Sequence, residues 1–170
     1  MIEIVNDFFE KDMFEKIKHH CTTKLNFEPQ YFVGTTERNK YTHYGDRYFL
    51  EDDLELFKQF SDTIEKKFKI KIIDHEYGGV DRRSLDHFKP HVDTEFGAVR
   101  NVMVMLSGPS AVSNGTVFYT EGELDIHVGF RENRAIFFPS NYVHSAHANN
   151  VPNLKRFSAT VFIKKYEKVL

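Results

Sequence analysis

The sequence predicts a mainly β (α+β) fold, an antiparallel β-sandwich or jelly roll supported by N-terminal helices. Before residue 70, apolar residues recur at helical spacing, whereas after it they alternate or form short runs between turn signals. The chain also contains 17 Phe and 8 Tyr, and aromatic side chains fit the pleated surface of a sheet. With 170 residues, no repeat and no inner boundary, residues 1–170 are expected to form a single domain.

Two amphipathic helices are predicted in the first part of the chain. Residues 2–6 favour a short strand, and Asp7 after it offers a helix cap. The first helix would bury a stripe of residues spaced three and four apart, namely Met13, Phe14, Ile17, Cys21 and Leu25. Asp52 and Asp53 can cap the second helix. Its expected buried face consists of Leu56, Phe57, Phe60, Ile64 and Phe68.

The segment 28–48 between these helices is polar and has no sustained period, which predicts a long connection. Two interpretations remain open for it: a lid over a functional site, and a surface excursion with a strand near residues 31–33. From residue 70 onward, strands are predicted at 71–77, 98–106, 116–119, 135–138 and 157–164. The turn signals between them include Gly78-Gly79, Asn114-Gly115, Gly122 and Gly129.

Charge content disfavours one class of partner, and cysteine content excludes two kinds of site. The formal charge of −2 and the pI near 6.5 give no electrostatic case for duplex nucleic acid as a partner. Cys21 is the only cysteine, which excludes an intramolecular disulfide and a cysteine-based metal site. We predict a half-buried packing role for Cys21 rather than a catalytic thiol. The chain shows neither a signal-peptide pattern nor a bilayer-length apolar run, so we expect no membrane partner and a cytoplasmic location. The oligomeric state stays open.

A candidate metal site begins at His91-Val92-Asp93. A lone His-x-Asp is common by chance, but this one follows Pro90, which favours extended backbone. On an extended strand His91 and Asp93 project from the same face and can chelate one ion. Two histidines and one carboxylate leave half of a metal's coordination sphere open, the arrangement of non-haem Fe(II) oxygenases.

The third ligand is expected from a segment far along the chain. Both His144 and His147 qualify, and His144 is preferred because it follows the apolar run 135–138 and a Pro-Ser turn signal. Further on, Arg156 and Ser158 fall on one face of the last predicted strand. A guanidinium binds a carboxylate through two parallel hydrogen bonds, so this pair could hold a dicarboxylate. The alternative for Arg156 is a solvated charge at a sheet edge.

These motifs, in this order, resemble those of the Fe(II)- and 2-oxoglutarate-dependent dioxygenases, and in particular small bacterial and phage-type prolyl-hydroxylase-like members. His91-Val92-Asp93 is similar to the family's H-x-D, Phe138-Pro139-Ser140 with His144 to its F-P-S and distal histidine, and Arg156-Phe157-Ser158 to its R-x-S. The resemblance implies a double-stranded β-helix. It also implies that His91, Asp93 and His144 bind Fe(II), and that Arg156 and Ser158 hold the far carboxylate of 2-oxoglutarate. O2 would be the other cosubstrate, and succinate and CO2 the products.

Other residues are weaker candidates for this site. Tyr77 and Asn101 are candidate contacts to 2-oxoglutarate, although a core Tyr and a surface Asn are alternatives. Arg82, Arg83 and Lys89 form a basic approach that could attract an anionic substrate. His127 is expected to be a core histidine.

The expected substrate is a peptide residue or a small molecule. Two other interpretations remain. A cupin-like isomerase or hydrolase would use the same ligands with Glu95 as base. A non-catalytic jelly-roll interaction module would use its histidines for structure only.

Overall fold

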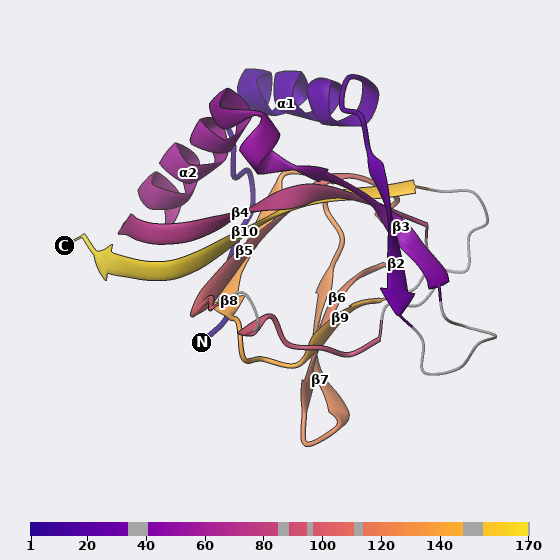
Figure 1. The fold of residues 1–170 in the computed structure, drawn as a ribbon. Helices are drawn as coiled ribbons and strands as arrows, with labels where there is room; N and C mark the ends of the chain where they lie inside the picture. The colour runs from indigo at the N-terminus through magenta and orange to yellow at the C-terminus, as the bar shows by residue number, and fades with distance from the viewer. Residues whose placement is uncertain (34–40, 85–88, 95–96, 111–113, 148–154, 170) are drawn as a thin grey trace.

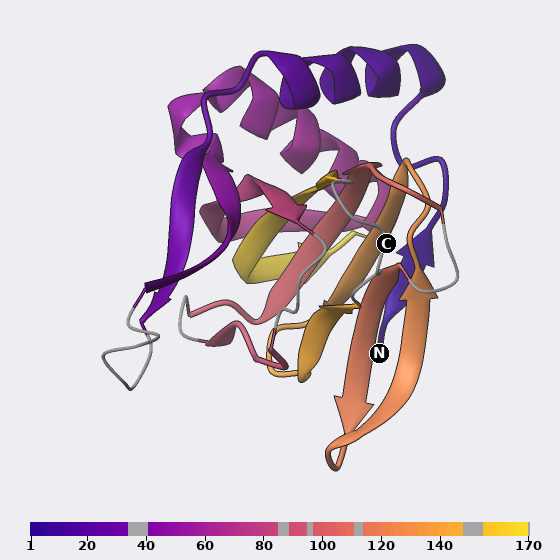
Figure 2. The same cartoon turned by 90° about the vertical axis from the view of Figure 1, so that its right-hand side faces the viewer.

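The computed structural model describes residues 1–33, 41–84, 89–94, 97–110, 114–147 and 155–169. Within these residues, two antiparallel sheets and two α-helices form the fold (Figures 1 and 2). The large sheet has the order β1 (Glu3–Val5), β8 (Arg134–Pro139), β5 (Arg100–Ser107), β10 (Lys155–Lys168), β4 (Ile70–Ser84), β3 (Tyr41–Phe49) and β2 (Glu28–Val33). The small sheet has the order β7 (Glu123–Gly129), β6 (Gly115–Thr120) and β9 (His144–His147).

The two sheets pack face to face, which confirms the mainly β jelly roll that the sequence predicts. The cluster between them draws residues from β5 and β8 of the large sheet and from β6 and β7 of the small one. Its buried members are Met103, Met105, Phe118, Val128, Phe130, Ile136 and Phe138. Phe118 and Phe138 meet edge to face with ring centroids 5.0 Å apart.

Two helices cover the opposite face of the large sheet, α1 (Lys11–Thr23) and α2 (Leu54–Phe68) (Figure 1). The predicted face of α2 is buried in full, and Asp53 caps the helix by accepting a 2.9 Å hydrogen bond from the backbone N–H of Leu56. None of these described helices is both long and apolar enough to cross a membrane.

The start of α1 differs from the expectation. Asp7 does not cap this helix, which begins four residues later without a side-chain cap. The intervening Phe8 and Phe9 are buried, and their backbone N–H groups bind the backbone and side-chain oxygens of Asn133 at 2.9 and 2.8 Å. The contacts of Phe8 and Phe9 with the core and with Asn133 thus occupy the residues just before α1, which begins at Lys11.

Cys21 on α1 is fully buried within the helix-side core. Burial and the nearby Asp53 raise the pKa of its thiol to about 12, so the reactive thiolate is scarce at neutral pH. The packing role predicted for this residue is correct, and its burial is complete rather than partial.

The strand β10 separates the helix-side core from the space between the sheets. Its alternate residues Phe157, Ala159, Val161 and Ile163 belong to the core under the helices. The intervening residues Arg156, Ser158, Thr160 and Phe162 face the other way and line a cavity. This parity places the predicted Arg156–Ser158 pair inside the molecule.

Segment 28–48 is not the long connection that the sequence predicts, although the strand considered near residues 31–33 is present. It forms the strands β2 and β3, which pair with each other, and β3 also pairs with β4. The residues between the two strands, 34–40, lie outside the described ranges. A short 3₁₀ helix, η2 (Leu50–Asp52), then leads into α2. The strands β7 and β9 are also absent from the strands predicted from the sequence.

The turn predicted at Gly78-Gly79 is also wrong, because β4 continues through both residues. Gly78 has a φ of 71°, and the register between β4 and β10 shifts beside it, which identifies a β-bulge. A Cβ atom at Gly78 would lie 1.9 Å from the carbonyl oxygen of Thr160. The glycine therefore permits a bulge within a long strand rather than a change of direction.

Candidate metal centre

His91 and His144 lie directly opposite each other in an isolated antiparallel bridge. Each donates a backbone N–H to the other's carbonyl oxygen, at 3.0 and 2.9 Å. Opposed residues in such a bridge share a face, and the two imidazole rings lie with their centroids 4.4 Å apart. The backbone N–H of Asp93 donates to the carbonyl oxygen of Ser140 at 2.9 Å, which holds the second predicted ligand beside them.

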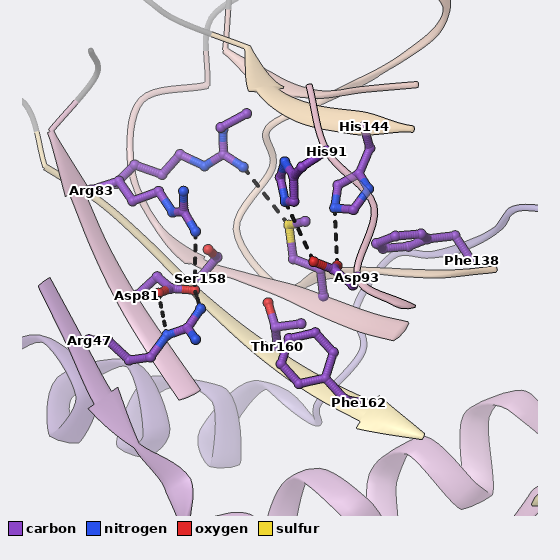
Figure 3. A pocket seen from close by; sticks show the side chains of 13 residues that line it. Arg47, Asp81, Arg83, His91, Asp93, Phe138, His144, Ser158, Thr160 and Phe162 are labelled. Atoms are coloured by element: carbon purple, nitrogen blue, oxygen red, sulfur yellow. Dashed lines mark hydrogen bonds and ion pairs between the residues drawn. The ribbon is translucent and has the colours of Figure 1, made fainter. Parts of the chain in front are cut away.

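The side chains of these three residues converge (Figure 3). Nε2 of His91 lies 3.6 Å from Oδ1 of Asp93, and Nε2 of His144 lies 3.3 Å from Oδ2. One ligand atom from each residue lies within 4.8 Å of the others, and the described residues contain no second group of this kind. Two imidazoles and a carboxylate therefore surround a common point.

Hydrogen bonds at the far side of each ring determine which nitrogen faces that point. Nδ1 of His91 lies 2.9 Å from the carbonyl oxygen of Lys89, and Nδ1 of His144 lies 2.9 Å from that of Tyr142. A carbonyl oxygen only accepts, so each Nδ1 carries a proton and Nε2 is the nitrogen that faces Asp93. Burial and the neighbouring His144 lower the pKa of His91 to about 4, which keeps that ring neutral.

Asn101 is buried beside the cluster and is not the surface residue that the sequence allows as an alternative. Its side-chain amide donates a 2.5 Å hydrogen bond to Oδ2 of Asp93. Its own Oδ1 is buried and has no hydrogen-bond partner among the described residues. Asn101 thus contacts the carboxylate of the cluster, and it is not among the residues that line the adjoining cavity.

A cavity of about 120 Å³ adjoins the cluster. Its walls come from β3, β4, β5, β8, β9 and β10 and from the segment that carries His91. The lining residues are Arg47, Asp81, Arg83, His91, Asp93, Met103, Phe138, His144, Ala146, Arg156, Ser158, Thr160 and Phe162.

Arg156 is 3% exposed in this cavity and is not the solvated edge charge considered as the alternative. Its guanidinium donates to the carbonyl oxygen of Gly115 at 2.5 Å and to Oγ1 of Thr116 at 3.3 Å, while Nε has no hydrogen-bond partner among the described residues. No carboxylate in the described part of the chain forms an ion pair with it. Burial and the nearby Arg83 lower its pKa to about 9. A buried guanidinium that has no carboxylate partner within the described residues would be stabilised by a bound anion.

The structure places the remaining predicted residues away from the cluster. Tyr77 packs under α2 with its ring 4.8 Å from that of Phe57, and it does not line the cavity. His147 turns toward His127, with ring centroids 5.0 Å apart. His127 is exposed on β7, so its expected place in the core is wrong.

The three residues of the predicted basic approach, Arg82, Arg83 and Lys89, have different surroundings in the structure. Arg83 lines the cavity, whereas Arg82 pairs with Asp46 at 2.8 Å. Lys89 is exposed. Glu95 lies outside the described residues.

Sequence reasoning missed Arg47 and Asp81, which also line the cavity. Nε and Nη2 of Arg47 donate to the two carboxylate oxygens of Asp81 at 2.9 and 3.2 Å. Burial alone would raise the pKa of Asp81, but Arg83 and Arg47 hold it below the usual value. The two residues belong to no motif and meet only because β3 pairs with β4 in this register.

No protein-family model matches this sequence, and no curated protein matches it either. Solved structures match by fold. A Pseudomonas putida prolyl-4-hydroxylase has a TM-score of 0.67 at 13% identity, over 96% of this chain and 92% of that chain. A Trichoplax adhaerens prolyl hydroxylase, in complex with a peptide fragment of the hypoxia inducible factor oxygen degradation domain, has a TM-score of 0.65 at 16% identity, over 95% and 82%.

The epimerase SnoN from nogalamycin biosynthesis, in complex with Fe3+, alpha ketoglutarate and nogalamycin RO, has a TM-score of 0.60 at 11% identity. The match covers 99% of this chain and 81% of that chain. At these identities the likeness establishes the fold. The chain has a jelly-roll fold, which it shares with these prolyl hydroxylases and this epimerase.

Proposed function

We propose that this chain is an Fe(II)- and 2-oxoglutarate-dependent dioxygenase that hydroxylates a peptide residue or a small molecule. The observation that carries the proposal is the convergence of His91, Asp93 and His144 beside a cavity that also contains the buried cation Arg156. The shared fold supports it, because the solved neighbours include prolyl hydroxylases and an epimerase in complex with Fe3+ and alpha ketoglutarate.

The donor set fits Fe(II). Two imidazoles and one carboxylate suit this ion and leave positions open for other ligands. The Nδ1–H groups bound to backbone carbonyls fix both rings, and Asn101 fixes the carboxylate. When bound, Fe(II) would supply the activation of O2 that couples oxidation of 2-oxoglutarate to succinate and CO2 with conversion of a substrate C–H bond to C–OH.

Arg156 and Ser158 fit the far carboxylate of 2-oxoglutarate. Both are buried in the cavity, and the guanidinium of Arg156 has a buried Nε without a hydrogen-bond partner among the described residues. A carboxylate there would neutralise the charge of Arg156 and accept hydrogen bonds from it and from the Ser158 hydroxyl. Met103, Phe138 and Phe162 supply apolar walls to the same cavity.

An anaerobic titration with Fe(II) and 2-oxoglutarate tests the proposal. We expect a weak visible charge-transfer band that requires both ligands, and a rise in melting temperature with each, because ligands that bind only the native state stabilise it. Asp93→Ala should abolish the band, whereas Asp125→Ala on the exposed strand β7 should retain it.

Three other results would each replace the proposal. Metal binding without 2-oxoglutarate binding would favour the cupin-like isomerase or hydrolase, with Glu95 as the base to test. Indifference to both ligands would favour a non-catalytic module. A metal that binds equally well to Asp93→Ala would place the metal site elsewhere. The cytoplasmic location is part of the proposal and is checked separately by cell fractionation.

A further inference from the structure

Met103 on β5 lies in the cavity wall with polar neighbours. Its sulfur atom Sδ accepts a hydrogen bond from Oγ1 of Thr116 at 3.4 Å and another from Nη2 of Arg156 at 3.9 Å. Nη2 of Arg156 also donates to Oγ1 of Thr116. A thioether sulfur is a weak acceptor. Two buried donors, one of them charged, therefore point at a partner that satisfies them poorly.

The four methionines of the chain all lie within the described ranges, and Met103 alone among them lines the cavity. Met105, two residues further along β5, is fully buried and absent from the cavity wall. Its sulfur accepts the backbone N–H of Arg131 at 3.3 Å. Met1 is 82% exposed, and Met13 is half-buried on α1. Met103 and Met105 thus share a strand but differ in their access to the cavity.

A small neutral molecule can reach Met103 through the cavity. The cavity volume is about 120 Å³, whereas about 10–15 Å³ of such volume is enough to hold one water molecule. The His91 side chain in its wall is 31% exposed, so this wall lies at the surface of the molecule. Hydrogen peroxide is only slightly larger than water, and because it is uncharged its entry requires no charge to leave the solvent. Met103 is therefore open to peroxide although it is 9% exposed.

The guanidinium of Arg156 has one pair of parallel donors left for a carboxylate. Nη1 donates to the carbonyl oxygen of Gly115, while Nε has no hydrogen-bond partner among the described residues and Nη2 lies against the sulfur of Met103. Nε and Nη2 are also the pair through which Arg47 binds the carboxylate of Asp81. A carboxylate that binds Arg156 in the same way would therefore need the nitrogen that now meets Met103.

Oxidation of Met103 would place a new acceptor beside this pair of donors. A sulfoxide is polar, and its oxygen is a stronger acceptor than a thioether sulfur. A polar group that is buried without partners is costly, but the donors of Thr116 and Arg156 already point at this sulfur. The sulfoxide oxygen would therefore compete with the far carboxylate of 2-oxoglutarate for Nη2 of Arg156. Bound 2-oxoglutarate would in turn cover the sulfur.

We propose that Met103 is an oxidation site, at which hydrogen peroxide forms a sulfoxide that blocks the carboxylate-binding donors of Arg156. The sulfur lone pair attacks one peroxide oxygen, and the S–O bond forms as the O–O bond breaks. The proton of the attacked hydroxyl passes to the leaving hydroxide, which departs as water. Sulfur is oxidised and peroxide is reduced, so no further reagent is required. Formation of the sulfoxide is independent of the proposed function, whereas the loss of 2-oxoglutarate binding rests on it.

Peroxide treatment of the full chain, followed by peptide mass spectrometry, tests the modification. Zn(II), which has no redox chemistry, is supplied in place of Fe(II) to avoid radical damage. We expect Met103 to gain one oxygen atom about tenfold faster than Met105, because only Met103 borders the cavity. Saturating 2-oxoglutarate should slow the oxidation of Met103 about fivefold or more and leave that of the exposed Met1 unchanged.

Calorimetry measures the consequence for 2-oxoglutarate. The affinity of the wild type should fall about tenfold or more after peroxide treatment, because the carboxylate loses a charge-assisted donor. Met103→Leu, a substitution that nearly conserves volume, should show the same affinity before and after treatment. Met105→Leu is the matched control, since it retains Met103 and should show the loss seen in the wild type. Each variant is compared with itself, and circular dichroism confirms its fold.

The possible failures differ in what they overturn. Equal oxidation rates for Met103 and Met105 would overturn the oxidation site. In protein that binds 2-oxoglutarate, an unprotected Met103, an unchanged affinity after its oxidation, or an equal loss of affinity in Met103→Leu would overturn the blocking of Arg156. If the untreated wild type binds no 2-oxoglutarate, the proposed function and the blocking effect fail together, while the rates for Met103 and Met105 still decide the oxidation site.

Discussion

Asn101 holds Asp93 through a 2.5 Å hydrogen bond to the carboxylate oxygen Oδ2, which also faces Nε2 of His144 at 3.3 Å. Asn101 is fully buried on β5, a central strand of the large sheet. The orientation of the carboxylate is therefore set by a rigid part of the fold before any metal binds, and metal affinity should depend on a residue that is not itself a ligand.

Replacing Asn101 by leucine should lower metal affinity about tenfold, the usual effect of losing a partner that orients a ligand. The melting temperature should change little, because the substitution removes a buried amide oxygen without a partner among the described residues as well as a hydrogen bond. Metal titration beside thermal unfolding measures both quantities. Unchanged metal affinity in a folded variant would limit Asn101 to a packing role.

Replacing Arg156 by methionine should weaken 2-oxoglutarate binding about a hundredfold, or about 2.7 kcal/mol, through the loss of charge-assisted hydrogen bonds. Metal binding should stay nearly intact. Without ligand the variant should be at least as stable as the wild type, since a buried charge is gone. Calorimetry with each ligand provides the measurement, and Lys155→Gln at an exposed neighbour is the control. Equal loss of metal and 2-oxoglutarate binding would make Arg156 a structural residue.

Replacing Gly78 by alanine should destabilise the fold by about 3 kcal/mol or more. The φ of 71° disfavours any side chain, and the added Cβ would collide with the carbonyl of Thr160 on β10. Gly129→Ala is the matched control, because a Cβ atom at that position would meet nothing within 4 Å, and it should cost less than about 1 kcal/mol. Urea unfolding compares the two. Similar midpoints for both variants would contradict the bulge geometry.

Cys21 should resist thiol reagents in the native protein. Its pKa of about 12 leaves a thiolate fraction at pH 8 that is roughly a thousandfold below that of an ordinary thiol, and burial adds a steric barrier. Lowering the pH reduces the fraction further, and only a pH near 12 would restore it. The rate of reaction with Ellman's reagent, with and without denaturant, gives the test. Rapid reaction under native conditions would show that α1 opens readily.

Sequence patterns predicted the elements whose burial is regular. The apolar stripe and the Asp53 cap predicted α2. The strands β4, β5, β6, β8 and β10 each overlap a strand predicted from the sequence. The strand considered near residues 31–33 lies within β2, but the pairing of β2 with β3 and the strand β7 were not predicted. Most of β7 is exposed on both faces, so its residues have no reason to alternate in hydrophobicity.

The candidate site shows the same limit. The apolar run and Pro-Ser turn before His144 favour it over His147, and the structure places His144 in the cluster and His147 beside His127. No local pattern could reveal Arg47 and Asp81, because their meeting depends on pairing between strands more than thirty residues apart. A turn was predicted at Gly78-Gly79, where β4 instead has a bulge, because glycine is favoured in both kinds of backbone.

The position of β10 has a consequence for the order in which a ribosome-bound chain matures. This strand follows the other described strands in the sequence, yet it lies between β5 and β4 in the middle of the large sheet. Until it emerges, two groups of strands, β1-β8-β5 and β4-β3-β2, each expose an edge that its backbone would later cover. The large sheet, and the cavity wall that β10 contributes, therefore cannot be complete before this strand has left the ribosome.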